Sequence, residues 1–500
     1  MDDVTHIIDS LNDAQRAAVT APVQNLLVLA GAGSGKTRVL VHRIAWLIQT
    51  EGLSPYSIMA VTFTNKAARE MRSRIEELLG LNPQGMWVGT FHGLAHRLLR
   101  AHWQNARLPE NFQILDSDDQ LRLIKRLCKE MALDENRWPA KQFQWYINAQ
   151  KDEGLRSQHI DPGNDIHMLT MLKVYAAYES ACERGGMIDF GELLLRSLEL
   201  LRDYKPELLA HYQQRFRYML VDEFQDTNSI QYAWLRLLCG SDRKLMAVGD
   251  DDQSIYGWRG AKIENIQHLP EHFPGTETIK LEQNYRSTNT ILQAANGVIH
   301  NNMGRLGKEL RTEAGDGESI SLYSAFNEQD EARFIVDQIQ KWTDGGNMRS
   351  ESAILYRSNA QSRVVEEMLI RAGVPYRIYG GQRFYDRLEI RNALAYLRLI
   401  NNRDDDTAME RVINVPTRGV GTKTIESLRE YARENQCSMW QAANDIIGLK
   451  LMTARAANAL QAFIELINQM EQDTSGTELH ERTEHLGPVT DSAPDDRSAK

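Results

Sequence analysis

The segment Leu26-Leu-Val-Leu-Ala-Gly-Ala-Gly-Ser-Gly-Lys-Thr37 decides the fold of this chain. It opens with a short apolar run that predicts a buried strand, and the helical pattern Arg38-Val-Leu-Val-His-Arg-Ile-Ala-Trp-Leu47 follows it. A glycine-rich turn between strand and helix, ending in Lys-Thr, is the pattern of a phosphate-binding loop. Its glycines let backbone N–H groups and the helix N-terminus converge on phosphate oxygens. The segment therefore predicts a nucleoside triphosphate site.

The pattern gives each position of this loop a role. Lys36 is expected to reach the β- and γ-phosphates, and the Thr37 hydroxyl to bind Mg²⁺. The strict pattern begins with glycine, whereas this loop begins with Ala30, which is small enough to keep the turn. The expected loop comprises Ala30, Gly31, Ala32, Gly33, Ser34, Gly35, Lys36 and Thr37. An ordinary glycine turn between a strand and a helix is the alternative interpretation.

Composition narrows the class of protein. The chain has 500 residues, 42% hydrophobic and 25% charged, which predicts a soluble globular protein of about three domains. No run approaches the ~20 apolar residues of a membrane span, and the N-terminus lacks the pattern of a signal peptide. The scattered Cys128, Cys182, Cys239 and Cys437 are expected to be reduced core thiols of a cytosolic protein. Because the net charge is -10, nucleic-acid binding would have to rely on local grooves and stacking aromatics.

Apolar runs alternate with helical patterns in two zones, which predicts parallel α/β sheets. Expected strands of the first zone are Leu26–Leu29, Ile58–Phe63, Trp87–Thr90, Met219–Asp222 and Leu245–Gly249. Expected strands of the second zone are Ile320–Ser324, Ala353–Tyr356 and Tyr376–Tyr379. Residues 91–214 have helical spacing and predict a helical insertion, and the pattern is helical again from about residue 380. Residues 471–500 have almost no large apolar side chains and predict a disordered tail.

Acidic residues follow a second expected strand in Met219-Leu-Val-Asp222-Glu223-Phe-Gln-Asp226. An acid at a strand end across from a phosphate-binding loop suits Mg²⁺ coordination, so Asp222 is the candidate metal ligand, acting through water. Glu223 is the candidate general base for the attacking water. A solvated acidic turn after a buried strand is the alternative.

A third apolar run leads into the polar loop that ends at Gly260. The Gln253 amide is suited to sense a γ-phosphate. Tyr256 and Trp258, next to Arg259, suit stacking on exposed bases. Packing at a domain interface is the other interpretation of these aromatics.

Six ordered segments together resemble the motifs of the UvrD/Rep/PcrA family of superfamily 1A DNA helicases. They are Ala30–Thr37, Thr62-Phe-Thr-Asn-Lys66, Thr90-Phe-His-Gly-Leu94, Asp222-Glu-Phe-Gln-Asp226, Gly249–Ala261 and Gln283-Asn-Tyr-Arg286. The resemblance runs from near Leu11 to about Met470. It implies P-loop NTPase, RecA-like motor domains with parallel sheets and mostly helical insertions.

The resemblance also implies how ATP is held. Gln15 matches the residue that reads adenine, although Asn12 or Asp13 would also make a good helix N-cap there. Arg38 and Tyr285 match the pair that sandwiches the adenine ring. Arg286 matches an arginine finger for the γ-phosphate, where a surface salt bridge would be the default for a lone arginine.

Contacts to DNA follow from the same resemblance. Stacking positions along a single strand are Phe63, Tyr256 and Trp258, and polar contacts are Thr62, Thr64, Asn65, His92, Arg259, Arg357 and Asn359. The segment Pro416-Thr-Arg-Gly-Val-Gly-Thr-Lys423 resembles a helix-hairpin-helix turn, in which Arg418 and Lys423 would meet duplex phosphates. An ordinary interhelical turn is the alternative for that segment.

The architecture that the resemblance implies is a first motor lobe at 1–90 and 215–280, with an insertion at 91–214. The second lobe would occupy 281–376 and its insertion 377–470, before the tail at 471–500. The implied activity is that of an ATP- and Mg²⁺-dependent 3′–5′ DNA helicase and single-stranded DNA translocase in nucleotide-excision and mismatch repair. The implied protein is cytoplasmic, acts at single strands and single/double-strand junctions, meets DNA-repair proteins, and works as a monomer or a DNA-assembled dimer.

The sequence departs from the family near its end. Two further motifs, a Thr-Leu-His-Ser-Ala-Lys-Gly-Leu-Glu type and a Tyr-Val-Gly-Val-Thr-Arg type, do not occur in these 500 residues. We therefore expect a C-terminally truncated member that binds ATP and single-stranded DNA but unwinds poorly. The main alternative is a non-unwinding ATP- and DNA-binding fragment. A helicase–nuclease motor subunit and a small-molecule kinase are less consistent with the residues present.

Overall fold

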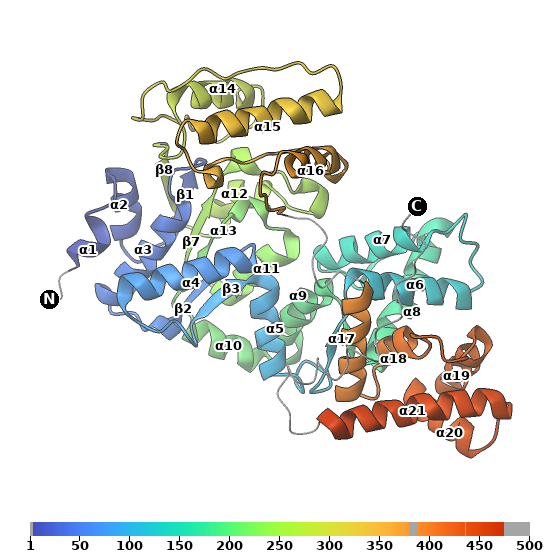
Figure 1. Cartoon of the computed structure of the whole chain (residues 1–500). Coiled ribbons are helices and arrows are strands. Elements are labelled where there is room, and N and C mark those ends of the chain that lie inside the picture. The colour runs from blue at the N-terminus through green and yellow to red at the C-terminus, as the bar shows by residue number, and fades with distance from the viewer. Residues whose placement is uncertain (1–3, 380–387, 436, 475–500) are drawn as a thin grey trace. The chain divides into compact units, whose positions relative to one another are not determined.

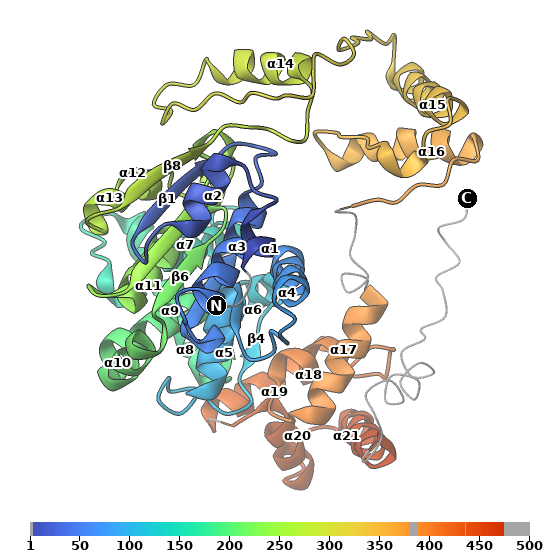
Figure 2. The ribbon, with the colours of Figure 1, turned by 90° about the vertical axis from the view of Figure 1, so that its left-hand side faces the viewer.

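The computed structural model describes residues 4–379, 388–435 and 437–474 (Figure 1 and Figure 2). The chain divides into two compact units, 1–319 and 320–500. Each unit is described by itself below.

A six-stranded sheet forms the centre of the first unit. Its strands are β1 (Leu26–Ala30), β2 (Ile58–Thr62), β3 (Trp87–Thr90), β6 (Tyr218–Val221), β7 (Lys244–Gly249) and β8 (Glu277–Leu281). They lie in the order β3-β2-β6-β7-β1-β8, and all neighbours pair in parallel. The five strands expected in the first zone are thus confirmed to within a residue, and the α/β fold class with them.

The edge strand β8 is the one strand of this sheet that the sequence did not predict. It reads Glu-Thr-Ile-Lys-Leu and pairs with β1 from Leu26 to Ala30. An edge strand is exposed along one side, so it lacks the continuous apolar run that marks a central parallel strand. β8 ends at Leu281, and the first compact unit continues to Ser319.

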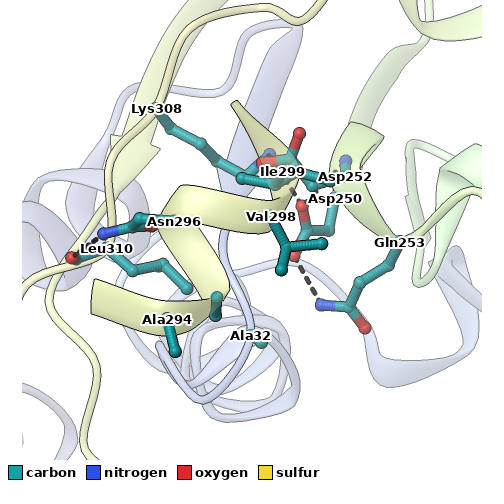
Figure 3. Close-up of a pocket in the computed structure, with 11 residues that line it drawn as sticks. Ala32, Asp250, Asp252, Gln253, Ala294, Asn296, Val298, Ile299, Lys308 and Leu310 are labelled. Carbon is teal, nitrogen blue, oxygen red and sulfur yellow. Dashed lines mark hydrogen bonds and ion pairs between the residues drawn. The ribbon is translucent and has the colours of Figure 1, made fainter. Parts of the chain in front are cut away.

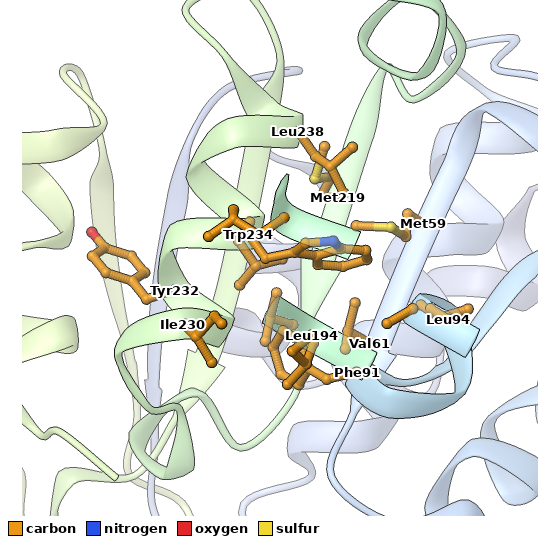
Figure 4. Close-up of a cluster of buried hydrophobic side chains, with 14 of the residues drawn as sticks. Met59, Val61, Phe91, Leu94, Leu194, Met219, Ile230, Tyr232, Trp234 and Leu238 are labelled. Atoms are coloured by element: carbon orange, nitrogen blue, oxygen red, sulfur yellow. The ribbon is translucent and has the colours of Figure 1, made fainter. Parts of the chain in front are cut away.

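Alternate residues of each central strand face two different cores, as the pleat of a strand requires. On one face, Leu26 and Val28 pack with α2 (Asp13–Thr20), α3 (Lys36–Gln49) and α4 (Asn65–Leu79). On the other, the core is shared by α5 (Phe91–Ala101), α9 (Phe190–Glu199) and α11 (Ser229–Cys239). Trp234 is fully buried there, among Met59, Val61 and Leu94 (Figure 4). The sheet is therefore covered on both sides, which suits a parallel sheet.

Residues 91–214 are mainly helical, in line with the sequence. Beyond α5 and α9, this segment contains α6 (Ser117–Glu130), α7 (Ala140–Asp152), α8 (Ile166–Arg184), a π-helical turn (Leu200–Tyr204) and α10 (Pro206–Arg215). Two short strands, β4 (Gln113–Ile114) and β5 (Met187–Ile188), also pair in parallel. Phe143, Ile147 and Tyr175 centre a core of its own.

Buried ion pairs hold the helices of this segment together. Lys151, at the end of α7, is 2% exposed and lies 2.8 Å from Asp189 Oδ2 and 3.0 Å from Glu192 Oε2. Arg156 adds a contact of 2.7 Å to Glu192. Burial alone would raise the pKa of Glu192, but Lys151, Arg156 and Arg196 outweigh it and hold that pKa far below its usual range. Glu192 therefore stays ionised inside the fold.

The rest of the first unit consists of short or peripheral helices. These are α1 (Thr5–Ile8), α12 (Glu264–Gln267), α13 (Leu269–His272) and α14 (Asn289–Ile299).

The regular secondary structure described in the second unit is all helical. Its helices are α15 (Glu328–Asp344), α16 (Ser362–Arg371), α17 (Leu388–Asn401), α18 (Asp406–Val412), α19 (Thr422–Glu434), α20 (Met439–Gly448) and α21 (Ala454–Thr474). Tyr396, Leu428 and Phe463 lie in the core formed by α17–α21. The predicted helical character of 377–470 is thus seen in its described part.

Three strands predicted for the second zone are absent from the described residues. Residues 320–324, 353–356 and 376–379 carry no strand pairing. Leu322 is 97% exposed and Leu355 is 94% exposed. An extended segment becomes a strand only when a neighbour pairs with its backbone, and apolar composition does not supply that neighbour.

The tail prediction is also corrected at its start. Residues 471–474 continue α21, and Glu471 lies 2.8 Å from Arg403. The remainder, 475–500, lies outside the described residues.

Three of the four cysteines, Cys128, Cys182 and Cys239, are buried free thiols. Among the helices that the structure describes, none has the length and apolar character needed to cross a membrane.

Replacing Lys151 tests the buried ion pairs. Lys151→Met leaves Asp189 and Glu192 buried without their cation, so we expect the free energy of unfolding to fall by roughly 3–5 kcal/mol. Urea denaturation measures it. The control is Lys262→Met, because Lys262 and Glu153 form an exposed pair, 40% and 41% accessible, worth at most about 1 kcal/mol. Equal losses in the two variants would contradict a stabilising buried network.

Candidate nucleotide and DNA site

The glycine-rich loop connects β1 to α3 as the sequence predicts. Gly33 and Gly35 have φ of 68° and 89°, a left-handed backbone that favours glycine. The Ser34 hydroxyl donates to Gly31 O at 2.7 Å and fixes the turn. Helix α3 begins at Lys36, so the first N–H groups of the helix have no intrahelical acceptor and are directed at the loop. The loop thereby has the geometry that binds phosphate.

Three carboxylates crowd the turn after β6. Asp222 is 4% exposed and Asp226 is 8% exposed, and Glu223 adopts a left-handed φ of 49° between them. Burial, and then the charge of Glu223, raises the pKa of Asp222 to about 7, and the same two causes raise the pKa of Asp226 to about 7. Lys36 Nζ lies 3.5 Å from Glu223 Oε2 and opposes this charge.

These acids fit a divalent cation. Asp226 Oδ1 is buried without a hydrogen-bond donor in the described part of the chain. Oxygen ligands of this kind suit Mg²⁺, which also relieves repulsion between neighbouring carboxylates. The residues that could hold it are Asp222 and the Thr37 hydroxyl at the start of α3.

Gln225 links the acidic turn after β6 to the loop after β7, which begins at Asp250. The sequence predicts no role for Gln225. It is 1% exposed; its Nε2 donates to Glu223 Oε2 at 2.8 Å, and its Oε1 accepts from Asp250 N at 2.9 Å. Gly249 permits this approach, since a Cβ there would lie 2.9 Å from Gln225 Oε1. In the sequence, the only signal for this role of Gln225 is its position between Glu223 and Asp226 in one motif. Gln225 therefore fixes the orientation of the candidate base.

A cavity of about 440 Å³ lies beside the loop (Figure 3). It is lined by Ala32, Asp250, Asp252, Gln253, Asn296, Lys308 and Leu310, among others. Lys308 is 4% exposed and lies 2.7 Å from Asp250 and 3.0 Å from Asp252. Burial would lower the pKa of Lys308, but the surrounding aspartates outweigh it and raise it. The Lys308 ammonium and the Arg305 guanidinium thus offset part of the charge of the acidic loop. Gln253, the expected γ-phosphate sensor, donates to Asp250 at the same place.

The segment after β8 lies directly against the glycine-rich loop. Tyr285 N donates to Gly33 O at 2.9 Å, and the Asn284 side chain donates to Ala32 O. A Cβ on Gly33 would lie 2.8 Å from Arg286 Cβ, so the candidate arginine finger stands next to the loop. The structure thus brings 284–286 together with the phosphate-binding residues.

Residues expected around the adenine lie at the other side of the loop. Gln15 is buried; it completes the N-cap of α2 with Asn12 and donates to Ser34 O at 2.8 Å. The Tyr285 hydroxyl accepts from Asn12 Nδ2 at 2.7 Å. Arg38 donates to Ser10 O at 2.8 Å and lines a cavity of about 400 Å³. The capping interpretation is confirmed, while the adenine contacts stay predictions.

Aromatic side chains gather where β2 and β7 end. Phe63 and Tyr256 stack with ring centroids 5.7 Å apart, and Trp258 is 74% exposed beside them. The Arg259 guanidinium lies 4.5 Å from the Trp258 ring centroid. Since an exposed tryptophan in a polar loop covers no core, this cluster suits stacking on bases better than packing.

The polar residues predicted to contact DNA differ in exposure. Thr64 and Asn65 are exposed at the start of α4, whereas Thr62 is 1% exposed at the end of β2. His92 is half-buried, with its ring 6.1 Å from the Phe190 ring, and burial lowers its pKa. Thr62 is therefore poorly placed for a direct contact, because β2 is covered by its neighbours.

In the second unit the predicted DNA residues fall into two kinds. Arg357, Asn359 and Lys423 are exposed. The Arg418 guanidinium instead donates to the carbonyls of Val412, at 3.0 Å, and Val415, at 2.9 Å. Arg418 thus holds the turn before α19, as an interhelical turn would require, and its role toward a phosphate stays a prediction.

A glycine-rich loop on a parallel sheet, with acids after another strand of the same sheet, defines a P-loop NTPase. Models of known protein families agree with this class and identify the family within it. Residues 11–274 match the UvrD/REP helicase N-terminal domain, and residues 279–486 match the UvrD-like helicase C-terminal domain. The chain belongs to the UvrD family of DNA helicases.

Relatives at high identity support this assignment. The chain is 63% identical to DNA helicase II of Escherichia coli and 57% identical to DNA helicase II of Haemophilus influenzae. Each match covers 97% of this chain and 67% of the relative. It is 43% identical to the ATP-dependent DNA helicase PcrA of Staphylococcus aureus, over 95% of this chain and 65% of that protein. The chain therefore spans about two thirds of the length of these relatives.

Gln225→Ala tests how the candidate base is held. The change removes the donor to Glu223 and leaves Asp250 N without its acceptor, so the carboxylate loses its fixed direction. We expect kcat for ATP hydrolysis to fall about 10²-fold, the cost of misplacing a reacting group by about 1 Å, with KM nearly unchanged. Steady-state ATPase kinetics measure both constants. A rise in KM at constant kcat would instead assign Gln225 to nucleotide binding.

Proposed function

We propose that this chain is an ATP-driven motor that moves along single-stranded DNA in the 3′–5′ direction and acts as a helicase in nucleotide-excision and mismatch repair. The observation that carries the proposal is the common edge of the sheet. There, half-buried Tyr256 and exposed Trp258 follow β7, and Asp222 and Glu223 follow the neighbouring strand β6. Its substrates would be single strands and single/double-strand junctions. Repair proteins are its proposed partners, and the active form is a monomer or a DNA-assembled dimer.

The proposed chemistry assigns one task to each side chain at the loop. Bound Mg²⁺–ATP supplies the scissile phosphoanhydride and a cation that offsets its charge. Lys36 and the N–H groups of 31–35 bind the phosphates, and Glu223 accepts the proton of the attacking water. Gln253 and Arg286 stabilise charge that develops on the γ-phosphate. Gln15, Arg38 and Tyr285 hold the base.

The proposed DNA track uses the aromatics after β2 and β7. Phe63, Tyr256 and Trp258 stack on bases, and sequence-independent contacts come from Arg259 and from exposed polar residues such as Asn65. We assign 1–90 with 215–280 to the first motor lobe and 281–376 to the second. The segments 91–214 and 377–470 are the proposed insertions.

A second candidate is a chain that binds ATP and single-stranded DNA without unwinding a duplex. The unpaired segments 320–324 and 353–356 favour it, because a motor needs a second lobe with a completed sheet. Strand displacement by the purified 500-residue chain supports the helicase, whereas gel retention of single strands without displacement supports the binding protein.

Comparing ATP hydrolysis with and without single-stranded DNA tests the motor. We expect DNA to stimulate the wild-type rate, and Lys36→Ala to lower kcat by roughly 10²–10³-fold, because the phosphates lose a fixed positive charge. Lys341→Ala, an exposed lysine on α15, is the matched control and should leave both rates unchanged. An ATPase that DNA does not stimulate would contradict the proposal.

Trp258→Ala tests the stacking surface. Loss of one stacked base weakens binding by about 1–3 kcal/mol, or about 5- to 150-fold in Kd. Fluorescence anisotropy of a labelled oligothymidylate measures it. Trp145, which is 62% exposed on α7, provides the control: Trp145→Ala should leave Kd as it is in the wild type. Similar weakening by both substitutions would mean that stacking at Trp258 is not specific.

A further inference from the structure

The C-terminal end of α7 reaches from the helical insertion into the motor lobe. Lys151 anchors it through the buried contacts to Asp189 and Glu192. The next residue, Asp152, is half-buried and accepts a hydrogen bond from Asn228 at the start of α11. A helix end fixed by buried charge is a rigid support for the side chain that follows.

Asp152 contacts the acidic loop of the nucleotide site. Asn228 Nδ2 donates to Asp152 Oδ1 at 2.9 Å, and Asn228 Oδ1 at the same time caps α11 by accepting from Gln231 N at 3.0 Å. Asn228 is 7% exposed and lies two residues beyond Asp226. The position of the turn that carries the three acids is thereby tied to α7.

Asp152 also lies against the aromatic loop. Gly260 ends the turn that contains Trp258 in a left-handed conformation, φ 85°, and a Cβ there would lie 3.7 Å from Asp152 Oδ2. Two residues on, Lys262 N donates to Thr227 O at 2.9 Å. The loop of the candidate DNA site and the loop of the candidate ATP site therefore meet at Asp152.

We propose that Asp152 is a positioning residue that couples DNA bound at Trp258 to ATP hydrolysis at Glu223, a proposal that rests on the motor function proposed above. Asp152 touches neither substrate. It holds Asn228 and the Gly260 turn in one arrangement, so that a shift of the aromatic loop on binding a base moves the turn that carries the acids. Without Asp152, the two loops keep their own binding sites, but binding of DNA at Trp258 no longer changes the position of the acidic turn.

The neighbouring Glu153 lacks these properties and serves as a comparison. Glu153 and Lys262 form an exposed pair, 41% and 40% accessible, which solvent screens. The bond from Asn228 to Asp152 is shielded and involves an ionisable acceptor, so its loss matters more. Burial, with Glu153 and Asp189, raises the pKa of Asp152 to about 6, so an asparagine is a mild replacement that keeps an acceptor oxygen.

The experiment uses the full chain and measures ATPase rates with and without oligothymidylate, its half-saturating concentration and the melting temperature. Asp152→Ala should leave the DNA-free rate within about twofold and lower the stimulation by DNA about tenfold, the size expected of one lost hydrogen bond to a charged group. Asp152→Asn should restore most of the stimulation. Glu153→Gln, which removes a charge from the same helix end, should behave as the wild type.

Asn228→Ser gives a second route to the same result if Asp152→Ala does not fold. Serine keeps the N-cap of α11 but has no amide to donate to Asp152, so the stimulation should again fall with the DNA-free rate retained. An equal fall of both rates, a normal stimulation in Asp152→Ala, or no rescue by Asp152→Asn would each overturn the proposal. Wild-type ATPase that DNA does not stimulate would instead refute the motor function itself.

Discussion

Parallel pairing of β6 between β2 and β7 is the constraint on which the rest of the first unit depends. Strands that run the same way end at the same edge of a sheet, so each loop that follows a strand emerges beside the loops of its neighbours. The loops after β1, β2, β6 and β7 carry the glycine turn, Phe63, the acids and the aromatics. The candidate nucleotide site and the aromatic cluster proposed to stack on DNA are thus set next to each other by backbone hydrogen bonding.

In this arrangement, the acidic turn and the loop after β7 are linked by direct hydrogen bonds. Gln225 spans from Glu223 to Asp250, and Thr227 O binds the backbone of Lys262, so the acidic turn touches the loop after β7 at two places. Packed interiors shift between discrete arrangements and do not deform smoothly. In the coupling proposed above, a movement at the aromatics reaches the acids through these hydrogen bonds, without a long chain of contacts.

The central part of this fold could be predicted because its residues have one strong local preference. Five strands of the first sheet are mainly apolar runs, and three of them, β1, β6 and β7, lead directly into glycine or an acid. The same apolar signal misled at 320–324 and 353–356, where no described partner pairs with the backbone. Periodicity reports which residues could be buried, while strand pairing depends on segments far away in sequence.

For the candidate site, the sequence predicts the residues of known motifs but not the residues that hold them in place. Motif residues such as Lys36 and Glu223 are recognisable because phosphate and proton chemistry restrict the side chain. Gln225 holds Glu223 and the backbone of Asp250, and Asp152 holds Asn228. Many polar side chains could make such hydrogen bonds, so no pattern marks these two residues. Their partners, Asp250 and Asn228, lie 25 and 76 residues away, and only the fold brings them together.

The buried ion pairs of Lys151 help to explain how Asp152 is placed. An apolar cluster at Lys151 would cost less desolvation, since ion pairs in an interior often stabilise no more than well-packed hydrophobic side chains. Ion pairs with hydrogen bonds are directional, however, and Lys151 between Asp189 and Glu192 restricts the direction of α7. Because Asp152 is the next residue, the angle of that helix end decides where its carboxylate lies. Directional bonds between α7 and the residues around Asp189 thus help to fix the contact of Asp152 with Asn228 at the start of α11.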